Sequence, residues 1–167
     1  MTISELFLPE FEQEVASTRR TLERVPDDRF DWRPHEKSMT MGALATHVAN
    51  IPSWARVVIE TDAFDVIGPD GKTVRAPEVA SREELLKLFE QNVEAARRAI
   101  AAASDEELAK AWALRAGEQT LFTAPRFAVL RRMVFNHLIH HRAQLGVYLR
   151  LNGIPVPSVY GPSADEA

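Results

Sequence analysis

The chain has 167 residues and a mass of 18.7 kDa, which is the size of one domain with a substantial core. Hydrophobic residues make up 46% of it and charged residues 26%, so the composition excludes a disordered or fibrous protein. The formal net charge of -4 at pH 7 provides no general attraction to nucleic acid or to an anionic membrane, and we expect neither as a partner. The sequence has no cysteine, which excludes disulfides, thiolate metal ligands and a cysteine nucleophile.

The first residues show no basic segment followed by an apolar run, and no run of about 18 residues is apolar enough to span a membrane. These features predict a cytoplasmic protein.

Apolar residues at helical spacing predict four long helices. They are expected at about residues 4–24, from 41 to before 68, after 81 as far as 103, and from 125 to 151. Ser81 and Glu84 match a capping box at the start of the third helix, and Ser104 with Glu107 repeats the pattern for a short further turn. The last helix is followed by Gly153, where a left-handed residue is expected.

The segments between these helices are predicted to be irregular. Pro34 interrupts the first connection, turn-forming residues dominate residues 68–77, and residues 111–123 are expected to form a loop or a small hairpin. Since the sequence has no repeat of fixed period, the simplest architecture is an all-α, up-down four-helix bundle with short irregular connections. It is expected to form a single domain over residues 1–167.

The last predicted helix contains three of the five histidines. His137 and His141 are four positions apart, so their imidazoles can point at one cation from adjacent turns. An apolar stripe from Leu130 to Leu151 includes both, which directs them to the bundle interior. A second register, through His137 and His140, fits the stripe nearly as well and remains open.

His47 occupies a core position on the second predicted helix, in a stripe with Leu44 and Ile51. A neutral imidazole buried there without a partner would leave polar nitrogens unsatisfied. One site shared with His137 and His141 explains all three histidines more simply than three separate packing roles. Three neutral histidine ligands keep the full charge of a divalent metal ion and leave a coordination position open, which is typical of a catalytic site.

These residues also have a plain structural interpretation, in which the histidines are hydrogen-bonded packing residues. His140 is expected to flank the site or lie on the surface, and His35 to be a solvated loop residue. Asn50 and Gln144, each one helical turn from a candidate ligand, either orient a bound water or substrate or form interhelical hydrogen bonds. Trp54 is expected in the core or in the wall of a cavity over the metal.

Several segments together resemble the DinB-like family of damage-inducible, metal-binding bundles. They are residues 25–28, 30–35, 38–47, 136–145, 148–150 and 160–166. The most specific parts are the histidine after the Ser-Met linker and the His-x-x-x-His-Arg-x-Gln-Leu segment, whereas residues 65–123 carry little family signal.

The resemblance implies a four-helix bundle, often dimeric, in which three histidines hold a divalent ion such as zinc or nickel. The family's ligands match His47, His137 and His141. The superfamily contains transferases and isomerases that use bacillithiol, mycothiol or glutathione. We therefore expect a divalent metal ion as cofactor, a low-molecular-weight thiol as cosubstrate, and a second copy of the chain as partner in a homodimer.

Two main functions follow as hypotheses. The first is a metal-dependent enzyme that activates a thiol or water for attack on a small-molecule electrophile, either as a thiol transferase or as a hydrolase. The second is a non-enzymatic, stress-related module that binds a metal or a ligand, and a purely structural bundle is a third reading. The residues alone identify neither the metal, since histidine suits zinc, copper, nickel and iron alike, nor a catalytic residue.

Overall fold

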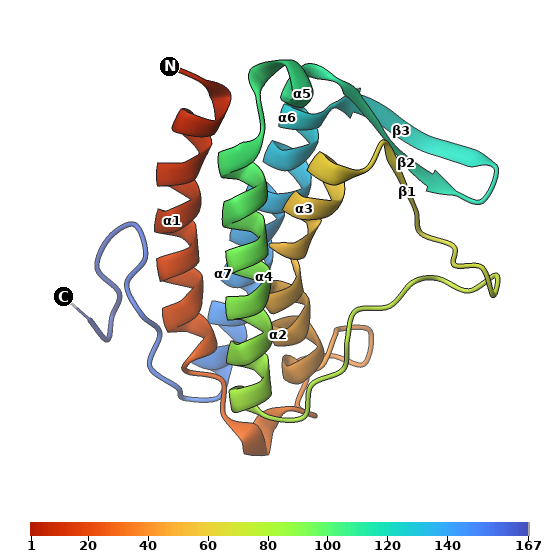
Figure 1. Ribbon diagram of the computed structural model, residues 1–167. Helices are drawn as coiled ribbons and strands as arrows, with labels where there is room; N and C mark the ends of the chain where they lie inside the picture. The colour runs from red at the N-terminus through yellow and green to blue at the C-terminus, as the bar shows by residue number, and fades with distance from the viewer. Residues whose placement is uncertain (167) are drawn as a thin grey trace.

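The computed structural model of the protein describes residues 1–166, and its helices form four rods that pack side by side (Figure 1). The first rod is α1 (Ile3–Leu22) and the third is α4 (Arg82–Ala102). The second rod consists of α2 (Met41–Asn50) and α3 (Ser53–Glu60). The fourth consists of α6 (Arg126–Leu130), a π-helical segment (Arg131–Asn136) and α7 (His137–Leu151). The four predicted helices are therefore all present.

Side chains fix where the helices begin. The Thr2 hydroxyl accepts a hydrogen bond from the Glu5 N–H (3.1 Å), and the Glu5 carboxylate accepts one from the Thr2 N–H (2.7 Å), which closes a capping box at α1. At Ser81 and Ser104 each hydroxyl accepts a hydrogen bond from the N–H three residues on, which confirms the serine half of the predicted capping boxes. The Glu84 carboxylate accepts from the Ala80 N–H (2.8 Å) and not from that of Ser81. Ser104 begins α5 (Asp105–Ala109), the expected short further turn.

The second rod is interrupted between α2 and α3 at Pro52. The apolar stripe predicts one unbroken helix through this position, and the structure corrects that prediction. Proline has no N–H to donate to the carbonyl four residues earlier, so the helix ends at Asn50 and begins again at Ser53.

The hydrophobic core lies between the four rods, since α1 and α2 each contact both α4 and α7. Its largest fully buried side chains include Phe11, Phe89, Trp112 and Phe135. Burial of each such side chain contributes about 1.5–3 kcal/mol, so this core fixes the relative positions of α2 and α7.

The direction of the rods differs from the predicted up-down order. The N–H of Arg82, at the start of α4, donates to the carboxylate of Asp27 after α1 (2.6 Å), and Ser4 at the start of α1 bonds the carbonyl of Ala103 after α4 (2.8 Å). Hence α4 is antiparallel to α1 and runs in the same direction as α2 and α3 (Figure 1). Two neighbouring parallel rods need a long link, and residues 61–81 cross the length of the bundle. The expectation of short connections throughout is therefore wrong.

The structure also corrects the all-α prediction, because a three-stranded sheet lies at one end of the bundle. Strands β2 (Ala111–Ala116) and β3 (Gln119–Pro125) form the expected hairpin, with Gly117 at a φ of +61° in its turn. Strand β1 (Ala63–Asp65) pairs with β2 in parallel. It contributes only three residues and pairs with a strand far along the chain, so it gives no local sequence signal.

After α7 the chain turns back along the bundle. Gly153 has a φ of +69°, the left-handed conformation expected at this helix end. The final segment then lies beside α1, where Glu166 forms an ion pair with Arg24 (2.7 Å). No helix among the described residues is both long enough and apolar enough to cross a membrane.

Candidate metal centre

His47 on α2 faces His137 and His141 on α7, and all three side chains are half-buried. One ligand nitrogen from each ring lies within 4.8 Å of the others. The ring centroids are separated by 4.9 Å for His47 and His137, 4.5 Å for His47 and His141, and 4.6 Å for His137 and His141. The structure thus brings together the three histidines that the sequence predicts as one cluster.

The donor spacing fits a metal ion. The Nε2 atoms of His47 and His137 are 3.2 Å apart. Two ligands at about 2.0–2.1 Å from a tetrahedral zinc ion would lie about 3.3 Å from each other. Both atoms of this pair are ring nitrogens, which can share one proton or one cation. The cluster can therefore hold a divalent ion with little rearrangement of His47 and His137.

Burial keeps the three rings neutral. Desolvation, together with the neighbouring His141 and His137 rings, lowers the pKa of His47 from 6.5 to about 4. Desolvation likewise lowers the pKa of His137 and that of His141. Neutral imidazoles at pH 7 have a free lone pair, which is the form that binds metals.

Gln144 orients the His141 ring. Its side-chain oxygen lies 2.7 Å from His141 Nδ1. An amide oxygen only accepts, so Nδ1 must hold the hydrogen, and the Nε2 lone pair of the same ring is free for a metal. Because this bond lies within α7, it is neither of the two contacts expected for Gln144: it positions a candidate ligand side chain, and it joins no second helix.

The π-helical segment sets the position of His137. This segment ends at Asn136, directly before His137, and it adds extra residues per turn just upstream of the site. A hydrogen bond with the Met133 backbone raises the pKa of His137 and partly opposes the effect of burial. The wider π-helical turn therefore determines where on the helix His137 projects.

Neither predicted stripe is the buried face of α7, which is formed by Leu138, Arg142, Leu145 and Leu149, and His140 lies outside the cluster. Its side chain is exposed, and its ring meets that of His141 edge to face, with centroids 4.7 Å apart. His35 is an exposed loop residue, as expected, and its Nδ1 accepts a hydrogen bond from the Lys37 N–H (3.1 Å).

Trp54 and Asn50 line a separate cavity of 280 Å³, whose lining does not include the three histidines. The Trp54 ring meets Phe64 edge to face at 4.8 Å. Arg75 and Pro77 line both this cavity and a larger one that includes His47 in its lining. Trp54 is thus a cavity wall, but of the neighbouring cavity.

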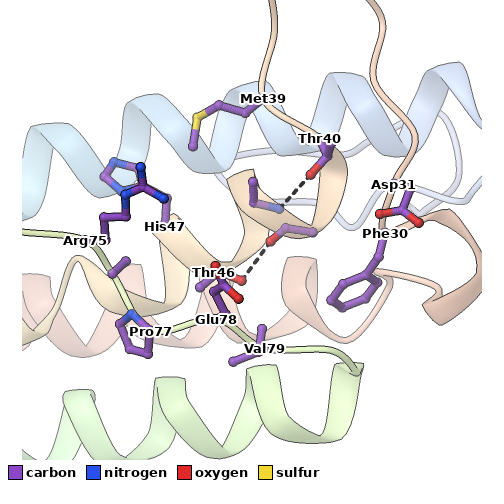
Figure 2. Close-up of a pocket in the computed structure, with 13 residues that line it drawn as sticks. Phe30, Asp31, Met39, Thr40, Thr46, His47, Arg75, Pro77, Glu78 and Val79 are labelled. Atoms are coloured by element: carbon purple, nitrogen blue, oxygen red, sulfur yellow. Dashed lines mark hydrogen bonds between the residues drawn. The ribbon is translucent and has the colours of Figure 1, made fainter.

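A larger cavity of 610 Å³ opens beside His47 (Figure 2). One side of it is α2 with Thr46, and another is the turn before α2, with Met39. Tyr148 on α7 supports that turn, since its hydroxyl donates to the Met39 carbonyl (3.2 Å) and its ring packs on Trp32 at 5.5 Å. The cavity can admit a small molecule to one side of the metal centre.

The remaining wall is formed by the crossover segment, with Arg75, Pro77, Glu78 and Val79. Sequence reasoning missed these residues. The segment has no apolar period, and its charged residues meet His47 only because the link runs the length of the bundle. On the other side of the centre, His137 lines a shallow cavity of 310 Å³ together with His140.

Comparisons with known proteins identify this architecture. The sequence model of the DinB family matches residues 1–167. Among solved structures, a DinB-like protein from Bacillus cereus ATCC 10987 superposes with a TM-score of 0.70 at 23% identity, covering 93% of this chain and 97% of that protein. A DinB-like protein from Bacillus subtilis gives 0.68 at 21% identity, covering 91% and 96%.

A putative member of the DinB family from Exiguobacterium sibiricum 255-15 gives a TM-score of 0.66 at 21% identity, covering 95% of this chain and 97% of that protein. At these identities the likeness concerns the fold alone. No curated protein matches the chain significantly. The full-length family match and the shared fold agree with the resemblance seen in the sequence, and the chain belongs to the DinB family.

Proposed function

We propose that His47, His137 and His141 bind a divalent metal ion, zinc or nickel, and that the protein is a metal-dependent enzyme. The observation that carries this proposal is the convergence of three neutral imidazoles, with ligand atoms within 4.8 Å of one another, beside a 610 Å³ cavity whose lining includes His47. Among residues 1–166 this cluster includes no carboxylate, so the charge of a bound cation stays uncompensated. Three protein ligands leave a position open for a further molecule.

A divalent cation held by three neutral imidazoles lowers the pKa of a thiol or water molecule that coordinates it, which supplies a nucleophile near neutral pH. The chain's own residues hold the geometry for this chemistry. Gln144 fixes the tautomer of His141, and the core between α2 and α7 holds His47 against His137. The adjoining cavity has a volume in the usual range for small-ligand sites, roughly 300–1,000 Å³.

The reaction we propose is attack by a low-molecular-weight thiol on a small electrophile, with hydrolysis through water as the related alternative. Family membership supports the thiol, and the site supports either nucleophile. The expected partners are therefore a small-molecule substrate and, as a homodimer, a second copy of the chain.

One observation favours a second candidate, a metal- or ligand-binding module without catalysis. Within residues 1–166, the three rings bond to one another, to Gln144 and to the Met133 backbone, and none of these partners is a carboxylate. No carboxylate bonded to the rings is placed to accept a proton from the nucleophile, so turnover would require the proton to pass to solvent or substrate.

The test is metal content, measured by mass spectrometry on tag-free protein purified without added metal. We expect about one ion per chain, lost in His47→Ala, His137→Ala and His141→Ala. His35→Ala is the matched control, because His35 is exposed in a loop and should leave the metal in place. Circular dichroism checks that each variant folds. No metal, and no tight binding of added zinc or nickel, would show that the histidines are packing residues.

The enzyme and the module are separated by a second assay. Metal-loaded protein is offered common low-molecular-weight thiols and a chlorinated aromatic electrophile. A rate above background that disappears with the metal and in His47→Ala supports the enzyme. Bound metal without any turnover supports the module, and turnover that persists without metal contradicts both.

A further inference from the structure

The cavity beside His47 is lined by charged side chains of both signs. Arg75 and Glu78 come from the crossover segment, and Asp31 comes from the turn before α2. Within the described chain, none of these three side chains forms an ion pair or a hydrogen bond to another protein group. By contrast, Arg126 pairs with Asp62 and Arg142 with Glu14. All three residues are exposed to solvent, so the cavity presents three charges that solvent or a ligand can pair.

The charges are separated along the cavity. Arg75 and His47 lie at one end in Figure 2, and Asp31 lies with Phe30 at the other. Glu78 lies between them, below Thr46. Apart from Glu78, the lining between the two ends is uncharged, and it includes Met39, Ala43, Thr46 and Pro77.

The metal centre strengthens this polarity. A histidine side chain is either neutral or positive, so the three ligands bring no negative charge to the His47 end. Arg75 is the only charged residue at that end of the cavity lining, whereas both carboxylates lie away from it. Complementary charges fix the orientation of a ligand more than they raise its affinity. A ligand would thus be held with an anionic group toward Arg75 and a cationic group toward Glu78 and Asp31.

We propose that this cavity binds a charge-separated zwitterion of amino-acid or short-peptide type, with its carboxylate at Arg75 and its ammonium group at Glu78 and Asp31. The volume of 610 Å³ accommodates a ligand of about dipeptide size. The inference rests on the proposed function and names the chemical class of its thiol. Arg75 and the two carboxylates are specificity-determining residues in this arrangement.

Four dipeptide thiols test the proposal on metal-loaded protein by titration calorimetry. Cysteinylglycine has both charges, N-acetyl-cysteinylglycine only the carboxylate, cysteinylglycine amide only the ammonium group, and N-acetyl-cysteinylglycine amide neither. We expect cysteinylglycine to bind tightest, with each blocked end weakening binding about two- to fivefold, as for partly exposed charge pairs.

Variants assign each charge to its side chain. In Arg75→Gln, blocking the carboxylate should no longer weaken binding, and in the double variant Asp31→Asn, Glu78→Gln, blocking the amine should no longer weaken it. Arg115→Gln and Glu118→Gln, which change exposed residues of the hairpin outside the cavity lining, should keep both effects.

The outcomes are separable from those of the metal test. If the uncharged dipeptide binds as well as the zwitterion, the proposed function stands and this inference is overturned. If blocking the carboxylate or the amine still weakens binding in the cavity variants, these charges contact other residues, and the inference is also overturned. If metal content is normal but none of the four thiols binds, both the thiol function and this inference fail.

Discussion

The guanidinium of Arg142 lies against the carboxylate of Glu14 in the interior of the bundle, with 2.6 Å between the charged atoms. The two side chains are only 4% and 6% exposed. Arg142 also donates to the hydroxyl of Tyr160 (2.8 Å), which in turn donates to Glu14 (2.8 Å). Since Arg142 directly follows His141, this network ties α1 and the C-terminal segment to the turn that holds the metal centre.

We expect Glu14→Gln to destabilise the protein by about 3–5 kcal/mol, because it leaves the Arg142 charge buried without its partner. Urea unfolding monitored by circular dichroism measures the change. Glu12→Gln is the matched control on the same helix. It breaks the exposed pair with Arg97, which should cost about 0.2–1 kcal/mol. Equal effects of the two substitutions would contradict the importance of burial.

The three site histidines could be predicted from the sequence because helical periodicity reports which residues share a face. His137 and His141 are one turn apart and His47 lies in an apolar stripe, which predicts that the three rings can face one another. The predicted α7 stripe is not the core face, however, because the rings are only half-buried and Leu138, Arg142, Leu145 and Leu149 are the buried residues of that helix. A stripe through His140 fits the helical period nearly as well as one through His141. Packing excludes His140 from the cluster, because its side chain is exposed in the folded bundle.

The cavity and the topology could not be predicted in this way. Arg75 and Glu78 lie in a segment without regular structure, so nothing local indicates which charges reach His47. The pairing of Ala63 with Ala113 joins residues 50 positions apart, and such non-local contacts leave no periodic pattern. The parallel direction of α3 and α4 could not be predicted for the same reason. It depends on where the crossover segment packs, which is also a matter of non-local contacts.

Gly42 permits the close approach of Phe30, which forms part of the cavity wall. A Cβ at this position would lie 2.5 Å from Phe30 Cδ1. Gly42→Ala should therefore displace the ring and destabilise the protein by about 1–3 kcal/mol, despite the higher helix propensity of alanine. Gly146→Ala is the control within α7, where the nearest atom is 3.7 Å away. That variant should be neutral or stabilising by up to about 1 kcal/mol in thermal unfolding. Equal destabilisation by both would contradict the role of Phe30.

Acid should destabilise the metal-free protein through its buried histidines. The pKa of His47 is about 4 in the folded state and 6.5 in its usual environment, so the unfolded chain binds more protons between these values. The contribution of neutral His47 to stability is fully present above its pKa in the unfolded chain, 6.5. It is lost as the pH falls through its pKa in the folded protein, about 4. Unfolding by urea in the presence of a chelator, at several pH values between these limits, measures the slope. His47→Gln should reduce the slope. An unchanged slope in His47→Gln would exclude His47 as its source.

Gln144 gives the most direct test of how the metal centre is held. Its side-chain oxygen fixes the tautomer of His141 without reaching the position of a metal ion, so Gln144→Leu should retain the fold and weaken metal binding about 10- to 100-fold. Gln144→Glu supplies an acceptor at the same place and should restore affinity. Competition with a chromophoric chelator measures both dissociation constants. Gln91→Leu, which changes an exposed glutamine on α4, is the control and should have no effect. If Gln144→Leu binds metal as tightly as the unaltered protein, the orientation of His141 comes from packing alone, and its hydrogen bond contributes nothing to the site.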